Sequence, residues 1–250
     1  MGTLLGLIAV AALSQGVDSP VGRGPKMVAD YVAAMQRATS LSATVSMQQI
    51  GGAPSTYSFQ FAKPNKARIE TPKQLMIADG TTLTILNKTN ATYFRAPETQ
   101  DGLGNILSGL EYMVWRPFFF PNALGRTLVT RPTGMVTRRG MTLDGVEVLY
   151  DPGEHYAVTL FLDPADNIVR QAEFVHSSLS TSESFIVDAK TLAINEAIPS
   201  SQFQFEPPAN GKQVSLDEMV TDRWYASLDE ALAVAARTNK LVLVDFYADW

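Results

Sequence analysis

The sequence predicts a mainly β protein: a curved antiparallel sheet, or incomplete β-barrel, with short helices lying over it. Three observations predict this fold. Short runs of alternating apolar and polar residues recur between turn residues. One apolar insert, Leu103 to Leu124, interrupts the series. A helix followed by a continuous apolar run then ends the chain, which indicates a separate α/β segment. The chain has 250 residues, long enough for one large domain or two ordinary ones.

Composition excludes several classes of function. The net charge is −5, whereas nucleic-acid-binding proteins usually carry a basic field. There is no cysteine, which excludes a disulfide framework, a thiol nucleophile and a cysteine-ligated metal within these residues. From the net charge we expect no nucleic-acid partner, and because no phosphate-binding or dinucleotide motif occurs, we expect no cofactor.

The N-terminus has most features of a secretory signal peptide. Leu4 to Leu13 is an apolar run, and Ala12-Leu13-Ser14 provides small residues for cleavage. No Lys or Arg precedes the run, so a buried N-terminal helix is the alternative. We predict a signal peptide over 1–14 and a periplasmic or otherwise exported bacterial protein.

The first part of the mature chain is predicted as linker, helix and strands. Residues 15–26 are rich in Gly and Pro and are expected to be a linker. Met27 to Arg37 has apolar residues at helical spacing. Period-two strands follow, with Gly51-Gly52 and Asp79-Gly80 as turns. The strands are expected around residues 43–47, 57–61, 67–71, 74–78, 83–86 and 92–95.

A second set of strands follows the insert. Asp144-Gly145 and Asp163–Asn167 are the predicted turns of this set. A last strand is expected at Gln202 to Pro208, where Phe203 and Phe205 alternate before Pro207-Pro208. The other strands are expected at 127–131, 134–139, 146–151, 157–162, 168–176 and 182–189.

The insert itself is predicted to form short apolar helices, because Gly and Pro break it into pieces. Such helices would either plug the open mouth of a curved sheet or cover it as a lid. Its aromatic residues therefore line either a core or a ligand cavity.

Beyond residue 210 the pattern changes to helix and then apolar strand. Ser227 and Glu230 form a predicted capping box at the start of a helix that ends at Asn239-Lys240. Leu241–Tyr247 is a predicted buried strand. We expect one domain over 27–212 and a second, partial one over 213–250.

An ordered series of motifs between residues 27 and 212 resembles the LolA-type periplasmic lipoprotein carriers. The family has a basic residue before Pro-Asn at a strand end, an Asp-Gly hairpin, a late hairpin and a closing Phe-x-Phe-x-Pro-Pro. The matching segments are Phe61-Ala62-Lys63-Pro64-Asn65, Ile77 to Leu83, Leu160–Val169 and Phe203 to Ala209.

The resemblance implies an incomplete barrel whose lid helices cover a cavity for acyl chains. The implied cargo is lipoprotein acyl chains or another lipid, and the implied protein partners are inner- or outer-membrane transfer proteins. Lys63 stands where the family often has an Arg for lid closure, and Lys lacks the planar, bidentate contacts of Arg. The implied ligand-binding residues are Phe59, Phe61, Lys63, Leu107, Leu110, Trp115, Phe118, Phe119 and Phe120.

The last residues resemble the start of a thioredoxin-like domain. Ser227–Asn239 is similar to its first helix, and Leu243 to Trp250 to its central strand. In that family Trp is followed by Cys-x-x-Cys, and Asp245 matches its buried acid. The resemblance implies a thiol–disulfide oxidoreductase in a longer parent protein, although the given chain has no catalytic residue.

Three functions therefore stay open for the chain: a non-catalytic carrier of acyl chains, part of an oxidoreductase, or a scaffold with a filled interior. His155 and His176 lack metal-ligand spacing, so we predict no metal site. Arg126, Arg131, Arg138 and Arg139 form a mildly basic stretch, either as solvated strand faces or as a contact for phospholipid or partner.

Overall fold

Two sets of antiparallel strands join into one curved sheet. The computed structural model describes residues 20–124, 127–150, 156–177, 182–219, 225 and 227–244. The first set is β1 (Ser40–Gln49), β2 (Ser55–Ala62), β3 (Lys66–Glu70), β4 (Gln74–Ala78), β5 (Thr82–Asn87) and β6 (Thr92–Pro97). The second set is β7 (Thr127–Arg138), β8 (Met141–Tyr150), β9 (Tyr156–Leu162), β10 (Val169–Ser177) and β11 (Ser182–Ile194).

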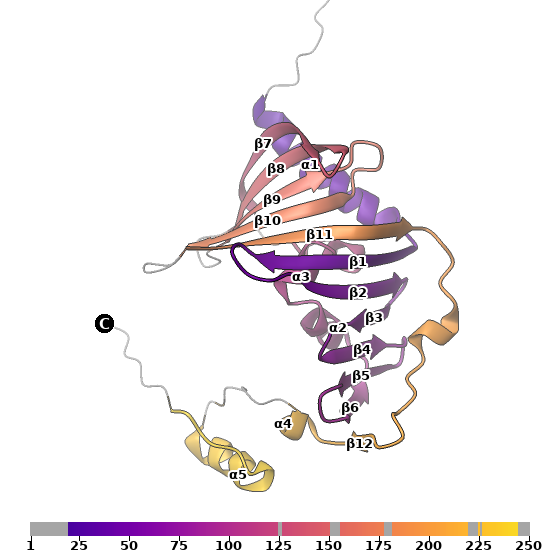
Figure 1. Ribbon diagram of the computed structural model, residues 1–250, viewed down its shortest axis with the longest axis vertical. Coiled ribbons are helices and arrows are strands. Elements are labelled where there is room, and N and C mark those ends of the chain that lie inside the picture. The colour runs from indigo at the N-terminus through magenta and orange to yellow at the C-terminus, as the bar shows by residue number, and fades with distance from the viewer. Residues whose placement is uncertain are drawn as a thin grey trace, which may run out of the picture.

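The sheet is continuous because the first and last long strands pair. Strand β1 lies antiparallel to β11, with Leu41 opposite Ile194 and Gln49 opposite Phe185. A short strand, β12 (Lys212–Gln213), lies at one edge, and the strand order is β12-β6-β5-β4-β3-β2-β1-β11-β10-β9-β8-β7. Figure 1 shows the resulting open, curved sheet. The predicted mainly β fold with few short helices is confirmed.

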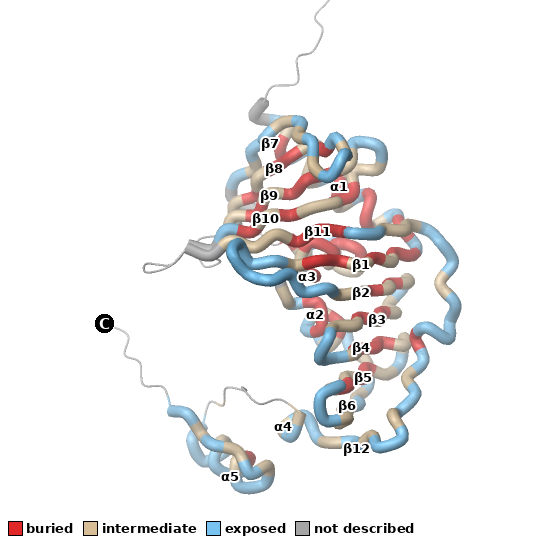
Figure 2. Tube along the Cα trace, viewed as in Figure 1, coloured by how far each residue is buried: buried red, intermediate tan, exposed pale blue. Residues whose placement is uncertain are grey.

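The helices gather on one face of this sheet, here called the inner face (Figure 1). They are α1 (Pro20–Arg37), α2 (Gln100–Ile106), α3 (Leu110–Met113) and the 3-10 helix η1 (Arg116–Phe118). Side chains from these helices and from alternate strand positions form one apolar core. Every second residue is apolar and buried from Leu41 to Val45 in β1 and from Phe59 to Phe61 in β2, as a half-buried sheet requires. Figure 2 shows buried stretches in both strands. The opposite, outer face carries the polar positions of the same strands.

The predicted linker over 15–26 is wrong for residues 20–26, because helix α1 already begins at Pro20. Tertiary contacts hold the first, Gly/Pro-rich part of this helix in place. Arg23 pairs with Asp144 of β8 at 2.5 Å. A Cβ atom on Gly24 would lie 2.7 Å from the Thr130 carbonyl oxygen, so only glycine permits this approach of helix to strand. Packing against the β7–β8 hairpin therefore overrides the local breakers.

The predicted turn at Asp144-Gly145 is also wrong. Both residues lie inside β8, and the hairpin turns at Arg139-Gly140 instead. The two strands predicted at 127–131 and 134–139 are one strand, β7, with a register shift between Pro132 and Gly134. A Cβ atom on Gly145 would lie 2.0 Å from Thr133 Oγ1. The glycine thus serves a close approach at a β-bulge rather than a turn.

The segment predicted as a last strand, Gln202 to Pro208, contains no strand. A 3-10 helix, η2 (Ser200–Phe203), comes first, and Phe203 is 2% exposed. Phe205 packs against Tyr93 of β6, with ring centroids 5.1 Å apart. The alternating phenylalanines anchor a crossing segment, which ends in the two-residue strand β12 (Lys212–Gln213) parallel to β6.

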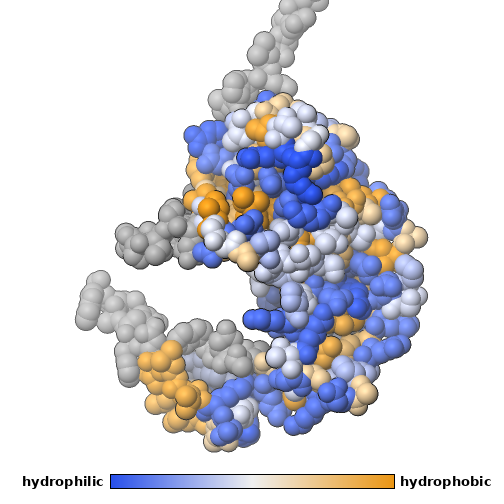
Figure 3. Space-filling view, viewed as in Figure 1, coloured by the Kyte–Doolittle hydropathy of each residue, from blue (hydrophilic) through white to orange (hydrophobic). Residues whose placement is uncertain are grey.

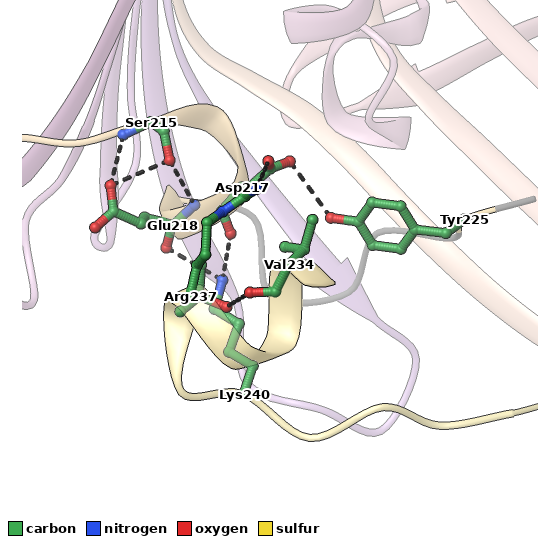
Figure 4. Close-up of polar contacts among 8 residues, drawn as sticks. Ser215, Asp217, Glu218, Tyr225, Val234, Arg237 and Lys240 are labelled. Carbon is green, nitrogen blue, oxygen red and sulfur yellow. Dashed lines mark hydrogen bonds and ion pairs between the residues drawn. The ribbon is translucent and has the colours of Figure 1, made fainter. Parts of the chain in front are cut away.

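The C-terminal helices are joined to each other by polar contacts (Figure 4). Helix α4 (Leu216–Met219) begins with a capping box: Glu218 Oε2 accepts from Ser215 N at 2.8 Å. The Asp217 carboxylate accepts from Arg237 Nη2 of α5 (Leu228–Thr238) at 3.2 Å. Lys240 donates to the Asp217 carbonyl at 2.7 Å. At Ser227 one half of the predicted capping box is confirmed, since the Ser227 side chain accepts from Glu230 N.

The buried strand predicted at Leu241–Tyr247 is not found at 241–244. These residues have no strand conformation, and Leu241 and Leu243 are 100% and 82% exposed. A strand needs a neighbour for its backbone hydrogen bonds. Within the described part of the chain, no strand pairs with this segment. Residues 1–14 and Asp245 lie outside the described residues, so the signal peptide and the thioredoxin-like resemblance stay predictions.

Candidate functional site

Aromatic side chains from the insert meet aromatic side chains from β2 on the inner face. Phe59 and Phe61 stack with ring centroids 4.5 Å apart. Trp115 lies 5.3 Å from Phe59, and Phe118 lies 5.9 Å from Phe61, centroid to centroid. Each of these four side chains is at most 1% exposed. The insert therefore plugs the inner face with its own side chains.

A polar contact set at the end of α1 holds the insert in place. The Gln36 side chain donates to the carbonyl oxygen of Pro117 and lies 3.4 Å from that of Phe118. The Lys63 ammonium donates to the Gln36 carbonyl oxygen and lies 5.1 Å from the Phe118 ring centroid. Burial lowers the pKa of Lys63, because it disfavours the charged form. These contacts link the helix, the strand end and the insert.

The plugged arrangement leaves two polar groups unsatisfied. Trp115 Nε1 and Arg116 Nε are buried and have no hydrogen-bond partner among the described residues. An unmade hydrogen bond at a buried group costs about 1–3 kcal/mol. The closed insert is thus less stable than its apolar packing alone would make it.

The structure brings most of the sequence-predicted site residues together. Phe119 lies 5.2 Å from Phe61, Phe120 lies 6.3 Å from Phe119, and Leu107 is fully buried in the same core. Leu110 begins α3, and its side chain lies outside the description. Asp245 is not described. The role of the sequence-predicted site residues in ligand binding stays a prediction.

Sequence reasoning missed two contributors to this site. Gln36 is one polar residue in the last turn of an amphipathic helix, and no motif marks it. Tyr112 is 2% exposed and makes an edge contact with Tyr57, with centroids 6.2 Å apart. It lies inside the predicted insert, so its aromatic character was the available signal.

The arginines of the basic stretch form ion pairs where the chain is described. Arg131, Arg138 and Arg139 each pair with a carboxylate, from Glu147, Glu173 and Asp188 respectively. Arg126 and His155 lie outside the described residues. Among described residues, no group of three His, Asp or Glu side chains could hold a metal ion. No described helix is long and apolar enough to cross a membrane.

Comparison with solved structures supports the fold. An uncharacterized conserved protein from Thermus thermophilus matches with a TM-score of 0.50 and 10% identity, over 77% of this chain and 99% of that chain. MucB matches with a TM-score of 0.50 and 16% identity, over 74% of this chain and 63% of its own. A LolA superfamily protein from Nitrosomonas europaea aligns with a TM-score of 0.33 and 12% identity, over 73% of this chain and 97% of that chain.

These likenesses concern the fold alone, since the identities are low. No known protein family matches the sequence, and no curated protein matches it. The fold that the motif series predicted, a curved sheet with a short helical insert, is found in the structure, and the two matches at a TM-score of 0.50 are likenesses to this overall fold.

Proposed function

We propose that the chain is an exported, non-catalytic carrier that holds an acyl chain between its inner sheet face and the aromatic insert. The observation that supports this most directly is the insert itself. It contributes fully buried Trp115 and Phe118 to the inner face, yet it is tied to α1 and β2 by the polar contacts of Gln36 and Lys63. In this proposal the insert is a lid, and the plugged arrangement is its closed, empty state.

Energetics allow such an exchange. Each buried CH₂ contributes about 0.8 kcal/mol, so an acyl chain offers roughly 10 kcal/mol before ordering costs. When the insert leaves Phe59 and Phe61 it gives up the burial of Trp115 and Phe118, and loss of a buried Trp or Phe side chain costs about 3–5 kcal/mol each. The unsatisfied Trp115 and Arg116 donors lower the cost of opening further. A ligand can then replace the insert against the sheet and be released again without any covalent step.

The test is native mass spectrometry of the protein expressed from the full sequence, processed by the cell and purified from a bacterial periplasm, before and after organic extraction. We expect extra mass that corresponds to acyl-chain lipid and that extraction removes. A clean apo mass, together with no uptake of a fluorescent fatty acid, would contradict the carrier and favour the filled scaffold.

A pair of variants tests the lid directly. Gln36→Ala removes the side-chain contacts to the insert, worth about 1 kcal/mol. It should raise the rate of fluorescent fatty-acid uptake about fivefold. Gln48→Ala is the matched control, because Gln48 donates to Gly52 in the distant β1–β2 turn at 2.9 Å. Equal rates in the two variants would show that the insert does not gate uptake.

A further inference from the structure

A groove of about 310 Å³ lies on the outer face of the sheet, over β11, β1, β2 and β3. Its position is opposite to the aromatic insert, because the inner positions of these strands belong to the apolar core. Its polar lining comes from Ser42, Thr44, Ser58, Gln60, Arg68, Glu70, Thr191 and Gln202.

Strand register explains why this part of the sheet is hollow. One transverse row runs Thr191, Thr44, Ser58 and Glu70 across four paired strands. The neighbouring row runs Ser42, Gln60 and Arg68. The short hydroxyl side chains lie on the central strands of these rows, and the long charged side chains of Arg68 and Glu70 lie on β3. In Figure 3 the surface over β1 and β2 is accordingly pale, with strongly hydrophilic residues next to it.

Helix η2 closes one side of the groove. Arg68 Nη1 donates to the Gln202 carbonyl oxygen at 3.3 Å, and Arg68 Nη2 lies 3.3 Å from Glu70 Oε2. Lys88 contacts the other Glu70 oxygen at 2.7 Å. The hydrogen bond from Lys88 is the largest of the effects that hold the pKa of Glu70 below its usual range. The charged wall of the groove is therefore an ion-paired cluster.

Several polar groups of the lining are unused. Within the described part of the chain, the Ser42 and Ser58 hydroxyls make no hydrogen bond. Gln60 Oε1 is buried without a partner, so its amide is not held in its present orientation. Hydroxyl groups both donate and accept, and an amide offers two donors and an acceptor. The groove thus presents hydrogen-bonding capacity that the fold leaves unsatisfied.

We propose that the outer-face groove binds a neutral saccharide. The lining matches such a ligand in three respects: it is polar, it carries one cation and one anion already paired, and it has both donors and acceptors. Adjacent hydroxyls of a sugar ring can bridge Ser58 and Gln60 while Arg68 and Glu70 bind from the wall. A free anion would meet the Glu70 carboxylate. An acyl chain would find few apolar groups, because the only apolar residues of the lining, Ala43 and Phe59, belong to the inner core. The site is independent of the inner face, so its test does not depend on the proposed carrier function.

The experiment is a ¹H–¹⁵N NMR titration of the whole chain with maltose and, separately, with N,N′-diacetylchitobiose. At least one of them should give saturable shifts of the Ser42, Ser58, Gln60 and Arg68 signals. Ser58→Tyr fills the groove floor and should weaken the apparent Kd at least tenfold. Thr56→Tyr places the same side chain two residues away on the same strand and face, outside the lining, and should stay within twofold of wild type.

Two results would overturn the proposal. One is the absence of saturable shifts with both disaccharides, when the same spectra show that the wild-type protein is folded. The other is equal binding by Ser58→Tyr and wild type, which would place the sugar elsewhere. Fluorescent fatty-acid uptake by Ser58→Tyr should equal that of wild type, because the substitution faces away from the insert.

Discussion

At the scale of single residues, the surroundings of Glu98 and Glu70 shift their pKa values in opposite directions. Burial raises the pKa of Glu98, and the nearby Asp79 carboxylate acts in the same direction. Its Oε2 accepts from Gly80 N at 2.9 Å, which only partly offsets the effect. Glu70 instead has a lowered pKa, chiefly through its hydrogen bond from Lys88. The two carboxylates should therefore make stability depend on pH with opposite signs.

The raised pKa of Glu98 predicts that Glu98→Gln stabilises the fold near neutral pH. The protonated form of Glu98 contributes stability below the unfolded-state pKa of about 4.3, and this contribution is lost as pH rises through the higher folded-state pKa. An uncharged glutamine can still accept from Gly80 and avoids that loss. Urea unfolding should show a higher free energy of unfolding for the variant at pH 7 and no difference at about pH 3.

Glu70→Gln is the matched control. The lowered pKa of Glu70 contributes stability above about pH 4.3, and this contribution is lost as pH falls through the folded-state pKa. This variant should be less stable than wild type at pH 7, and the difference should shrink in acid. If both variants shift the pH 7 free energy in the same direction, the opposed environments are refuted.

At the scale of elements, sequence pattern predicted strands better than turns. Period-two alternation identified β1, β2 and β9 because one face of each is buried. Asp144-Gly145 has the chemistry of a hairpin turn, but the positive φ angles of the hairpin belong to Arg139, at 51°, and Gly140, at 77°. Glycine serves both backbone freedom and close packing, and sequence alone does not separate them. Likewise Phe203 and Phe205 follow the alternation of a strand, but their segment pairs with no strand through its backbone.

The close packing of Gly145 predicts that Gly145→Ala destabilises the β7–β8 hairpin. The new methyl group would collide with Thr133 Oγ1, and overpacking of this kind costs about 1–3 kcal/mol. Adding Thr133→Ala removes the clashing oxygen, so the double variant should recover most of the loss in urea unfolding.

Gly22→Ala tests whether any glycine-to-alanine change has this effect. No atom lies within 4 Å of a Cβ at Gly22, which is an exposed residue of α1. Here alanine should be neutral or stabilise by up to about 1 kcal/mol. A loss at Gly22 as large as at Gly145 would rule out the packing explanation.

At the scale of the whole molecule, the aromatic contacts of the candidate site could be predicted from the sequence, but the polar contacts that hold the insert could not. Apolar residues must be buried, so the insert had to meet the inner face of the sheet. The link between Gln36 and Pro117 joins positions 81 residues apart, and no local pattern encodes such a contact. The sequence does not predict the outer-face groove for the same reason, since the shape of the groove depends on the register between four strands.

The predicted division of the chain near residue 212 leads to a prediction about stability. The apolar core and the residues packed on it end at Ile194, and η2 adds buried Phe203. Helix α5 buries only Val234 and is joined to α4 by the Asp217 contacts. The sheet therefore gains little from anything beyond β12.

Truncation after Val214 should accordingly leave the melting temperature of the sheet unchanged to within about 2 °C. Truncation after Pro199 is the control, because it also removes Phe203 and the contact between Arg68 and Gln202. Loss of a buried phenylalanine costs about 3–5 kcal/mol, so this shorter chain should melt roughly 6 °C lower or more. Circular dichroism of the two truncated chains measures both values. A large drop for the first truncation would mean that α4 and α5 belong to the same cooperative unit as the sheet, and the predicted boundary would then be wrong.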